Sequence, residues 1–586
     1  MTLEVYEAGG NASHTRIRLG QADFVGQGGE AAVYAKGNRA YKIYTDPGRS
    51  LPGAKIAELA VLSEPCYIRP EALLLDRANR PVGYSMRRVQ GGTPLCQIFT
   101  RAFRDRKGLT PEKVLELVRQ FREGVARVHQ GRILVVDLNE MNFLLDQRLR
   151  EILFIDVDSY QTPGFPATAL MESVRDRHSS RFSEGTDWFA FGIVSFQMFI
   201  GIHPYKGKHP SLNTLDARMQ ANVSVLHPEV NVPRVCLPFS VIPPAYLSWY
   251  RALFEHGKRL PPPTDLREQL VLVVAASAGA VGNGPLQLIE LCRFASDVVT
   301  PFVIRNTFSA LTRDGLSGSV GPAGGVPSPV GTPLIPPVGG PGTPDGGPAG
   351  AEIGYSPRER RPIAACVDAG RLVLFDLQQS RPLTTAIAAD AVTSCDGRLL
   401  AQHGAVLHQV ELLELPAGIQ AALTPVGNLL PNAARLFEGV AIQNLLGAWH
   451  AVLSPRAGTG YTVALPELAG YQVVNARYEN QVLLVVGARA GQFDRFCFRF
   501  DPEFRHRDVR RDADVPNPEL NFTVLDSGVV LLLNEQDELE MFSHRVGASD
   551  RQTLTDPALT GAKLFHRGAQ LLLARGGTLF AASLRS

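Results

Sequence analysis

Five residues in the first half of the chain have the types and the order that phosphoryl transfer requires. Asp137 and Asn142 lie five residues apart in DLNEMN, and Asp156 follows 19 residues after Asp137 in FIDVD. One carboxylate can orient an attacking hydroxyl, while an amide oxygen and a second carboxylate hold Mg²⁺ on phosphates. Upstream, Lys42 could contact the phosphates, and Glu58 could form an ion pair with Lys42 and hold it there.

A glycine-rich stretch precedes the lysine. Gly26, Gly28 and Gly29 allow a backbone to approach a phosphate closely, and Val33 begins the strand after this turn. Glycine-rich hairpins without a ligand are also common, so the glycines alone are weak support. Lys42 lies between two apolar residues, and strand alternation would point it to the opposite face from both.

Three further elements must position these side chains. A helix over GAKIAELAVL would carry Glu58, and the alternative is a Glu on a solvated helix face. PVGYSMRRV is typical of a strand that leads into a connector, where Met86 and Arg88 would border an adenine. ILVVDLNEMNFLLD and EILFIDVDSYQ place the acidic residues in loops next to apolar strands.

A third block makes a family resemblance explicit. TDWFAFGIVSFQMFIGIHPYKG predicts a long apolar helix that opens with Asp187, and FEHGKRLPPP follows with Arg259. With the earlier motifs, this resembles the eukaryotic-type Ser/Thr protein kinase family in a divergent bacterial subgroup, over about residues 17–270. The resemblance implies that the protein binds ATP and Mg²⁺. It implies that Lys42 contacts the phosphates and that Glu58 pairs with Lys42. It further implies that Asp137 is the catalytic base, that Asn142 and Asp156 are Mg²⁺ ligands, and that Asp187 is a structural anchor.

The sequence departs from that family at several motif positions. The third glycine is Ala31, Asn139 stands where protein kinases usually have a Lys, and Asp156-Val157-Asp158 replaces Asp-Phe-Gly. The His-Arg before the catalytic Asp and a clear Ala-Pro-Glu segment are missing, so we expect no strict requirement for loop phosphorylation. Two alternatives stay open: a pseudokinase or nucleotide-sensing scaffold, and a kinase of small molecules.

The chain also divides by composition. Leu316 to Gly350 is rich in Gly and Pro and almost uncharged, which predicts a flexible linker. We therefore expect a multidomain chain: an α+β bilobal kinase-like fold over 1–270 (N-lobe 15–90, C-lobe 91–270), a C-lobe extension or connecting segment over 271–315, the linker over 316–350, and an all-β domain over 351–586. The stretch 265–312 could close the C-lobe with helices or contribute a strand to the all-β domain.

Short apolar runs with Gly, Asn or Asp breaks fill the region after the linker, and they are typical of β-hairpins. The starts of six such runs are spaced by 27, 42, 41, 48 and 41 residues. A period near 40 predicts a β-propeller of five to seven blades, with a β-sandwich or another all-β fold as the alternative. We expect this domain to recruit a protein substrate or to sense a signal.

Charge and composition exclude some classes of function. The formal net charge is +2, which argues against a nucleic-acid-binding protein driven by bulk charge. We expect a cytoplasmic protein, because the seven cysteines are scattered and no signal peptide is recognisable. We also expect no membrane span, because the longest apolar run has thirteen residues (270–282). The subgroup resemblance links the chain to stress-type gene clusters, with a metal-dependent protein phosphatase and a von Willebrand-type domain protein as partners.

Overall fold

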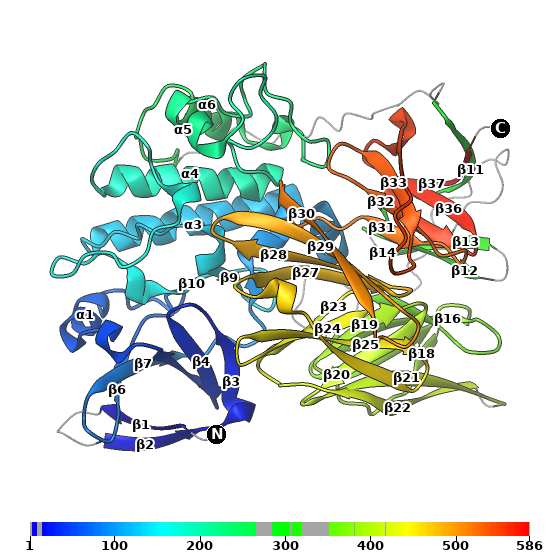
Figure 1. Ribbon diagram of the computed structural model, residues 1–586, viewed down its shortest axis with the longest axis horizontal. Helices are drawn as coiled ribbons and strands as arrows, with labels where there is room; N and C mark the ends of the chain where they lie inside the picture. Colours follow the sequence, from blue (N-terminus) through cyan, green and yellow to red (C-terminus); the bar gives the residue numbers. More distant parts are fainter. Residues whose placement is uncertain are drawn as a thin grey trace.

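The computed structural model describes residues 3–8, 14–264, 284–304, 307–313, 315–318, 351–379, 381–416 and 418–584. The apolar run over 270–282 and residues 319–350 of the expected linker lie outside the described residues. Figure 1 shows a mixed α/β part built from the first half of the chain beside a β-rich part built from the second half. Among the described residues, no helix combines the length and the apolar character needed to cross a bilayer.

The N-terminal lobe is an antiparallel seven-stranded sheet in the order β2-β1-β6-β7-β5-β4-β3. One short helix, α1 (Gly53–Leu59), packs against strand β6 of this sheet. The predicted N-lobe thus extends further towards the N-terminus than residue 15. The strands are β1 (Leu3–Ala8), β2 (His14–Leu19), β3 (Phe24–Gln27), β4 (Ala31–Lys36), β5 (Arg39–Tyr44), β6 (Ala72–Leu75) and β7 (Pro81–Arg87).

The second lobe is mainly helical. Its central helix is α4 (Glu184–Ile200). This helix is buried along almost its whole length because its side chains are apolar on all sides, and Ser183 caps its first turn. A small sheet in the order β10-β9-β8 carries the loops with the acidic residues. The elements are β8 (Thr93–Pro94), α2 (Arg101–Lys107), α3 (Pro111–Gln130), β9 (Phe143–Leu145), β10 (Ile152–Phe154), α4 (Glu184–Ile200), α5 (Leu215–Ala221) and α6 (Pro244–Phe254).

The β-rich part consists, in its described residues, of seven small antiparallel sheets. Five are four-stranded meanders of consecutive strands, joined by short turns. These are β15 (Glu352–Tyr355), β16 (Pro362–Asp368), β17 (Arg371–Asp376) and β18 (Arg381–Leu383); β19 (Ala391–Cys395), β20 (Arg398–His403), β21 (Val406–Leu415) and β22 (Gly418–Asn428); β23 (Ala434–Phe437), β24 (Val440–Leu445), β25 (Ala448–Arg456) and β26 (Thr459–Ala464); β27 (Gln472–Glu479), β28 (Val482–Arg489), β29 (Gln492–Phe500) and β30 (Arg507–Val515); and β31 (Phe522–Val524), β32 (Val529–Leu533), β33 (Glu538–Ser543) and β34 (Arg551–Thr555).

The two remaining sheets correct the predicted domain boundaries. β11 (Leu286–Arg293) pairs with β37 (Thr578–Leu584) at the other end of the chain, next to β36 (Gln570–Arg575) and β35 (Lys563–Arg567). β12 (Val298–Ile304), β13 (Thr307–Thr312) and β14 (Gly315–Gly318) form a three-stranded sheet. The described part of 271–315 is therefore neither a C-lobe extension nor a connecting segment, and 316–318 belong to a strand rather than to the linker. The reason is that β11 pairs with β37 at the edge of one sheet, and the apolar side chains of β12 and β13 pack against that sheet.

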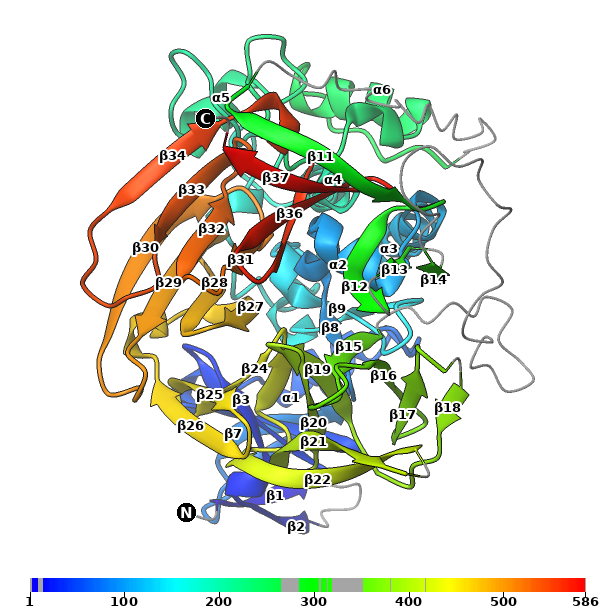
Figure 2. The same ribbon diagram turned by 90° about the vertical axis from the view of Figure 1, so that its right-hand side faces the viewer.

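The sheets contact one another in sequence and close on themselves. β12 contacts β16, β15 contacts β19, β22 contacts β26, β24 contacts β27, and β31 contacts β35. Between the sheets of β27 and β31, the amide of Val524 donates to Oε1 of Glu479 at 2.7 Å. Val298 and Ala310 of the three-stranded sheet share a core with Leu572 and Leu579 of the sheet that contains β37. Figure 2 shows the result, in which the sheets follow one another around a centre. We call this arrangement the β-ring.

The β-ring packs directly on the helical lobe. One continuous apolar core includes residues of helices α3 and α4 together with residues of β28 and β29, such as Leu484 and Cys497. Helix α2 lies at the opening of the β-ring (Figure 2), where Glu519 of the ring accepts hydrogen bonds from the amides of Arg101 (2.7 Å) and Ala102 (3.1 Å). The two parts are thus joined by both apolar and polar contacts.

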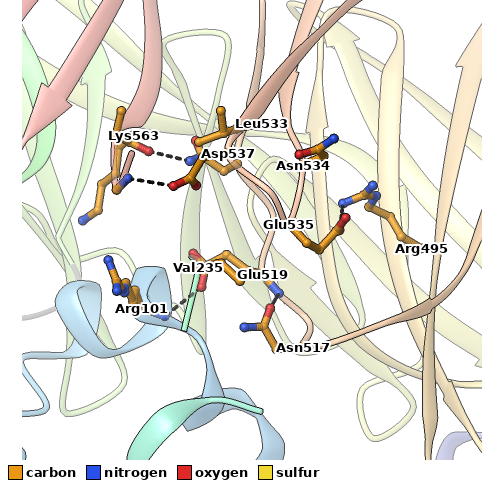
Figure 3. A pocket seen from close by; sticks show the side chains of 13 residues that line it. Arg101, Val235, Arg495, Asn517, Glu519, Leu533, Asn534, Glu535, Asp537 and Lys563 are labelled. Atoms are coloured by element: carbon orange, nitrogen blue, oxygen red, sulfur yellow. Dashed lines mark hydrogen bonds and ion pairs between the residues drawn. The ribbon is translucent and has the colours of Figure 1, made fainter. Parts of the chain in front are cut away.

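Two cavities accompany this junction. The larger, of about 350 Å³, lies inside the β-ring, and Arg106 of α2 contributes to its lining beside Glu352, Glu479 and His566. Figure 3 shows the smaller one, of about 60 Å³, where Arg101 of α2 faces residues of the β-ring. Neither cavity is lined by any of the residues that the sequence analysis assigns to phosphoryl transfer.

Candidate functional site

Lys42 lies between two aspartates at the interface of the two lobes. Its Nζ is 2.7 Å from Oδ1 of Asp156, and 2.9 and 3.1 Å from Oδ2 and Oδ1 of Asp158. The Lys42 side chain is 12% exposed, and the Asp156 side chain is 49% exposed. Burial alone would lower the pKa of Lys42, but the charges of Asp158 and Asp156 raise it, so the amine stays protonated.

The predicted ion pair between Glu58 and Lys42 is absent, and this prediction is corrected. Glu58 lies on α1, but its Oε2 accepts a hydrogen bond from the amide of Gly164 at 3.0 Å. A hydrogen bond from Thr162 and the Gly164 amide lower the pKa of Glu58. Helix α1 is oriented so that Glu58 binds the segment after Asp158. Lys42 pairs with the carboxylates of Asp158 and Asp156 instead.

The glycine-rich turn connects β3 and β4 next to the lysine. Gly26 pairs with Val33, and Val33 in turn lies opposite Lys42 in the register of β4 and β5. A Cβ atom added at Gly26, Gly28 or Gly29 would meet no heavy atom within 4 Å. The backbone of this turn therefore has open space beside it, as a close approach by phosphate oxygens requires.

The two residues expected at the adenine differ in their surroundings. Met86 lies on β7 and packs against the apolar cluster that contains Tyr84. The guanidinium of Arg88 instead donates to the carbonyl of Gly37 at 3.1 Å and to Oδ1 of Asn432 in the β-ring at 2.6 Å. The Arg88 side chain thus joins the N-lobe to the β-ring, and the expectation that it binds the nucleotide is corrected for the side chain.

Asp137 and Asn142 come together in the loop before β9. Nδ2 of Asn142 donates to the backbone oxygen of Asp137 at 2.9 Å and to its Oδ2 at 3.1 Å. Oδ1 of Asp137 accepts a hydrogen bond from the amide of Met171 at 2.6 Å. Both oxygens of this carboxylate therefore have one donor each in the structure, and each oxygen keeps a lone pair that could accept a hydrogen bond from a hydroxyl.

The conformation of this loop depends on Asp187 at the start of α4. Its carboxylate oxygens accept hydrogen bonds from the amides of Val135 (2.8 Å) and Val136 (2.9 Å). Nε2 of His129 lies 2.9 Å from Oδ2. Val136 has φ +63°, a left-handed conformation that costs a β-branched residue about 1–3 kcal/mol. Asp187 is fully buried and accepts hydrogen bonds from the amides of Val136 and of the residue before it, so it anchors the loop that carries Asp137.

Asp156 also has a left-handed backbone, with φ +58° and ψ +29°. The amide of Ile155, its neighbour, donates to the carbonyl oxygen of Asn142 at 3.0 Å, which joins the two loops. Asn142 donates through Nδ2, so its Oδ1 is the atom suited to a cation. The half-exposed Asp156 carboxylate and this amide oxygen are the hard oxygen donors that Mg²⁺ prefers. The residues therefore fit an ATP–Mg²⁺ site.

The sequence analysis missed several residues of this site. Asp158 appeared only as a departure from a family motif, and Lys55, Tyr44 and Tyr84 were not singled out. One signal was available: Tyr44 follows Lys42 by two residues on one strand, so both side chains point to the same face. Met171 carried no signal, because it acts through its backbone amide.

Comparison with known proteins gives partial matches. No family model matches the chain. A segment is 25% identical over 183 residues to the striated muscle preferentially expressed protein kinase of Danio rerio, covering 28% of this chain and 6% of that protein. The solved structure of the Cydia pomonella granulovirus kinase PK-1 aligns with 41% of this chain and 88% of its own, at 14% identity and a TM-score of 0.32. The sequence comparison thus shows similarity to a protein kinase over part of the chain, and the chain spans a small fraction of that relative's length.

Proposed function

We propose that this protein is an ATP- and Mg²⁺-dependent Ser/Thr protein kinase. The observation that carries the proposal is the joint placement of Lys42, Asp156 and the Asp137–Asn142 pair beside an open glycine-rich turn. The partial sequence similarity to a protein kinase supports it. Ser or Thr as the acceptor follows from the resemblance of the motifs.

Each residue has a defined task in this proposal. Lys42 contacts the phosphates of ATP, and Asn142 and Asp156 would hold Mg²⁺. When bound, Mg²⁺ supplies positive charge that neutralises the phosphates during transfer. Asp137 accepts the hydroxyl proton of the acceptor through its carboxylate, while the Met171 amide holds Oδ1. Asn142 keeps Oδ2 of the same carboxylate in place.

We further propose that the β-ring is a seven-bladed β-propeller that recruits a substrate or senses a signal. The support is the succession of seven sheets that contact one another in order, together with the pairing of β11 with β37. Such pairing of a strand from one end with strands from the other end closes a propeller and leaves no free edge at the junction.

A second candidate function is a nucleotide-sensing scaffold without transfer activity. The observation that favours it is the hydrogen bond from the Met171 amide to Asp137, because a donor to the ionised carboxylate makes it a weaker base. In this case nucleotide binding would be retained, and the β-ring would carry the output.

The test is transfer of γ-³²P from ATP in the presence of Mg²⁺, to the protein itself and to a generic protein substrate. We expect label with the wild type, none with Asp137→Asn, and unchanged label with Asp550→Asn, an exposed residue of the β-ring. If the wild type incorporates no label but ATP raises its melting temperature, the scaffold or a small-molecule acceptor replaces the proposal.

A further inference from the structure

We propose that Asp158, and not a carboxylate of helix α1, is the residue that positions Lys42 for the nucleotide. This inference rests on the proposed function and adds to it a positioning residue from a different element. Two aspartates that lie two residues apart then have different roles. Asp156 remains available to a cation, and Asp158 positions the Lys42 amine.

The two aspartates differ in how they hold the amine. Asp158 contacts Nζ of Lys42 with both carboxylate oxygens, whereas Asp156 uses Oδ1 alone. The Asp158 side chain is 7% exposed, against 49% for Asp156. A cation that binds the exposed carboxylate would draw it away from the lysine, and the buried carboxylate would remain as the counter-charge.

Two tyrosines fix the Asp158 carboxylate. The hydroxyl of Tyr44 donates to Oδ2 at 2.8 Å, and the hydroxyl of Tyr84 donates to Oδ1 at 2.7 Å. Tyr84 lies directly opposite Lys42 in the register of β5 and β7, and Tyr44 follows Lys42 by two residues on β5. Three side chains on one face of the sheet thus converge on a single carboxylate, and each of its oxygens has a tyrosine donor.

This environment keeps Asp158 ionised. Burial alone would raise its pKa, but the charge of Lys42 and the hydrogen bonds from Tyr84, Lys42 and Tyr44 lower it. A fixed anion of this kind is what a buried lysine needs in order to stay protonated next to apolar groups. The lysine and its carboxylate therefore form a charge pair that exists before any nucleotide arrives.

Helix α1 contributes through a lysine instead of a glutamate. Lys55 is 2% exposed, and its Nζ donates to the backbone oxygen of Asp158 at 2.7 Å. The helix therefore positions Lys42 indirectly, by holding the turn that contains Asp158. Glu58, one helical turn further on, binds the amide of Gly164.

The experiment compares two carboxylates of the same neighbourhood in the full-length chain. Asp158→Asn keeps the shape of the side chain and removes the charge, and Glu58→Gln is the matched control. Binding of a fluorescent ADP analogue with Mg²⁺ is measured at pH 7 for each variant, alone and combined with Lys42→Ala. Binding of adenosine, which lacks the phosphates, is measured alongside.

We expect Glu58→Gln to bind the analogue with the affinity of the wild type. In Asp158→Asn the lysine loses the carboxylate that holds it with both oxygens, so affinity for the analogue should fall about tenfold or more. The same substitution should have no further effect in the Lys42→Ala background, and all variants should bind adenosine equally. A purely structural role for Asp158 would weaken the binding of both ligands by the same factor, with or without Lys42.

A loss of analogue binding with Glu58→Gln, or an effect of Asp158→Asn that persists in the Lys42→Ala background, overturns the assignment of Asp158. A wild type that binds neither ligand overturns the proposed function. Non-additive changes in melting temperature for Asp158→Asn and Lys42→Ala would then leave the lysine–aspartate pair standing. If Asp158→Asn does not fold, Tyr84→Phe removes one donor to the carboxylate, and a smaller loss of analogue binding is expected; no change would contradict the inference.

Discussion

At the scale of single residues, the loop that carries Asp137 depends on one buried carboxylate. Asp187 accepts the amides of Val135 and Val136, and it compensates for the left-handed backbone of Val136. Because Asp187 is fully buried, its charge is tolerated only while these donors and His129 remain in place. Side chains that never touch a substrate thus determine where the candidate base lies.

We expect Asp187→Asn to lower the free energy of unfolding by about 3 kcal/mol, because the amide group accepts with only one oxygen and leaves a buried donor unpaired. Phosphotransfer should be lost as well, since Val136 can then leave its strained conformation. Urea denaturation and the γ-³²P assay measure the two effects. Asp216→Asn, which removes an exposed ion pair with Arg177, should cost less than about 1 kcal/mol.

At the scale of elements, helix α3 approaches strand β10 closely because of one glycine. A Cβ atom at Gly124 would lie 2.4 Å from Cζ of Phe154, which packs edge-on to Phe143 and near Phe121. Phe154 is the last residue of β10, the strand that leads to Asp156. The contact therefore sets the distance between helix α3 and the end of this strand. An alanine would favour the helix but would collide with the ring.

We expect Gly124→Ala to destabilise the protein by up to about 2 kcal/mol. The gain in helix propensity of about 1 kcal/mol is smaller than the typical cost of overpacking, about 1–3 kcal/mol. The melting temperature should fall, whereas Glu123→Ala on the exposed side of the same helix should leave it within a degree or two. A higher melting temperature for Gly124→Ala would show that the phenyl ring can move aside without loss.

At the scale of the whole molecule, helix α2 joins the kinase-like part to the β-ring. Arg106 forms an ion pair with Glu438, and Asp105 contacts Lys563 at 2.7 Å. The turn at Gly491 approaches Ser173 and Met171, so the β-ring also contacts the segment whose amide lies on Asp137. The two parts therefore share contacts at the candidate site as well as at α2.

We expect Glu438→Ala to cost about 2–4 kcal/mol, because it leaves the largely buried charge of Arg106 without its closest partner. Calorimetry should show a single unfolding transition for the wild type and two separate transitions for the variant. Glu4→Ala breaks the more exposed pair with Arg16 and should leave the single unfolding transition unchanged. Equal effects of the two substitutions would contradict the role of α2 as the joint.

Much of the fold could be predicted because it is encoded locally. The alternation around Lys42, the capped apolar helix after Ser183, and the hairpins after residue 351 depend on neighbours within a few residues. The sequence left open whether residues 265–312 belong to the C-lobe or to the all-β part, because the partner of β11 is β37, almost the full length of the β-ring away. Pairing over such a distance leaves no periodic signal in either strand.

The sequence by itself determined which residue types stand in order for phosphoryl transfer, since Lys42, Asp137, Asn142 and Asp156 belong to short motifs. Only the tertiary structure decided which carboxylate holds the lysine. Glu58 and Asp158 offer the same chemical group, and the choice between them depends on the rotation of α1 and on the two tyrosines across the sheet. Electrostatic partners are selected by distance and burial in three dimensions, and neither quantity is a property of a local stretch of sequence.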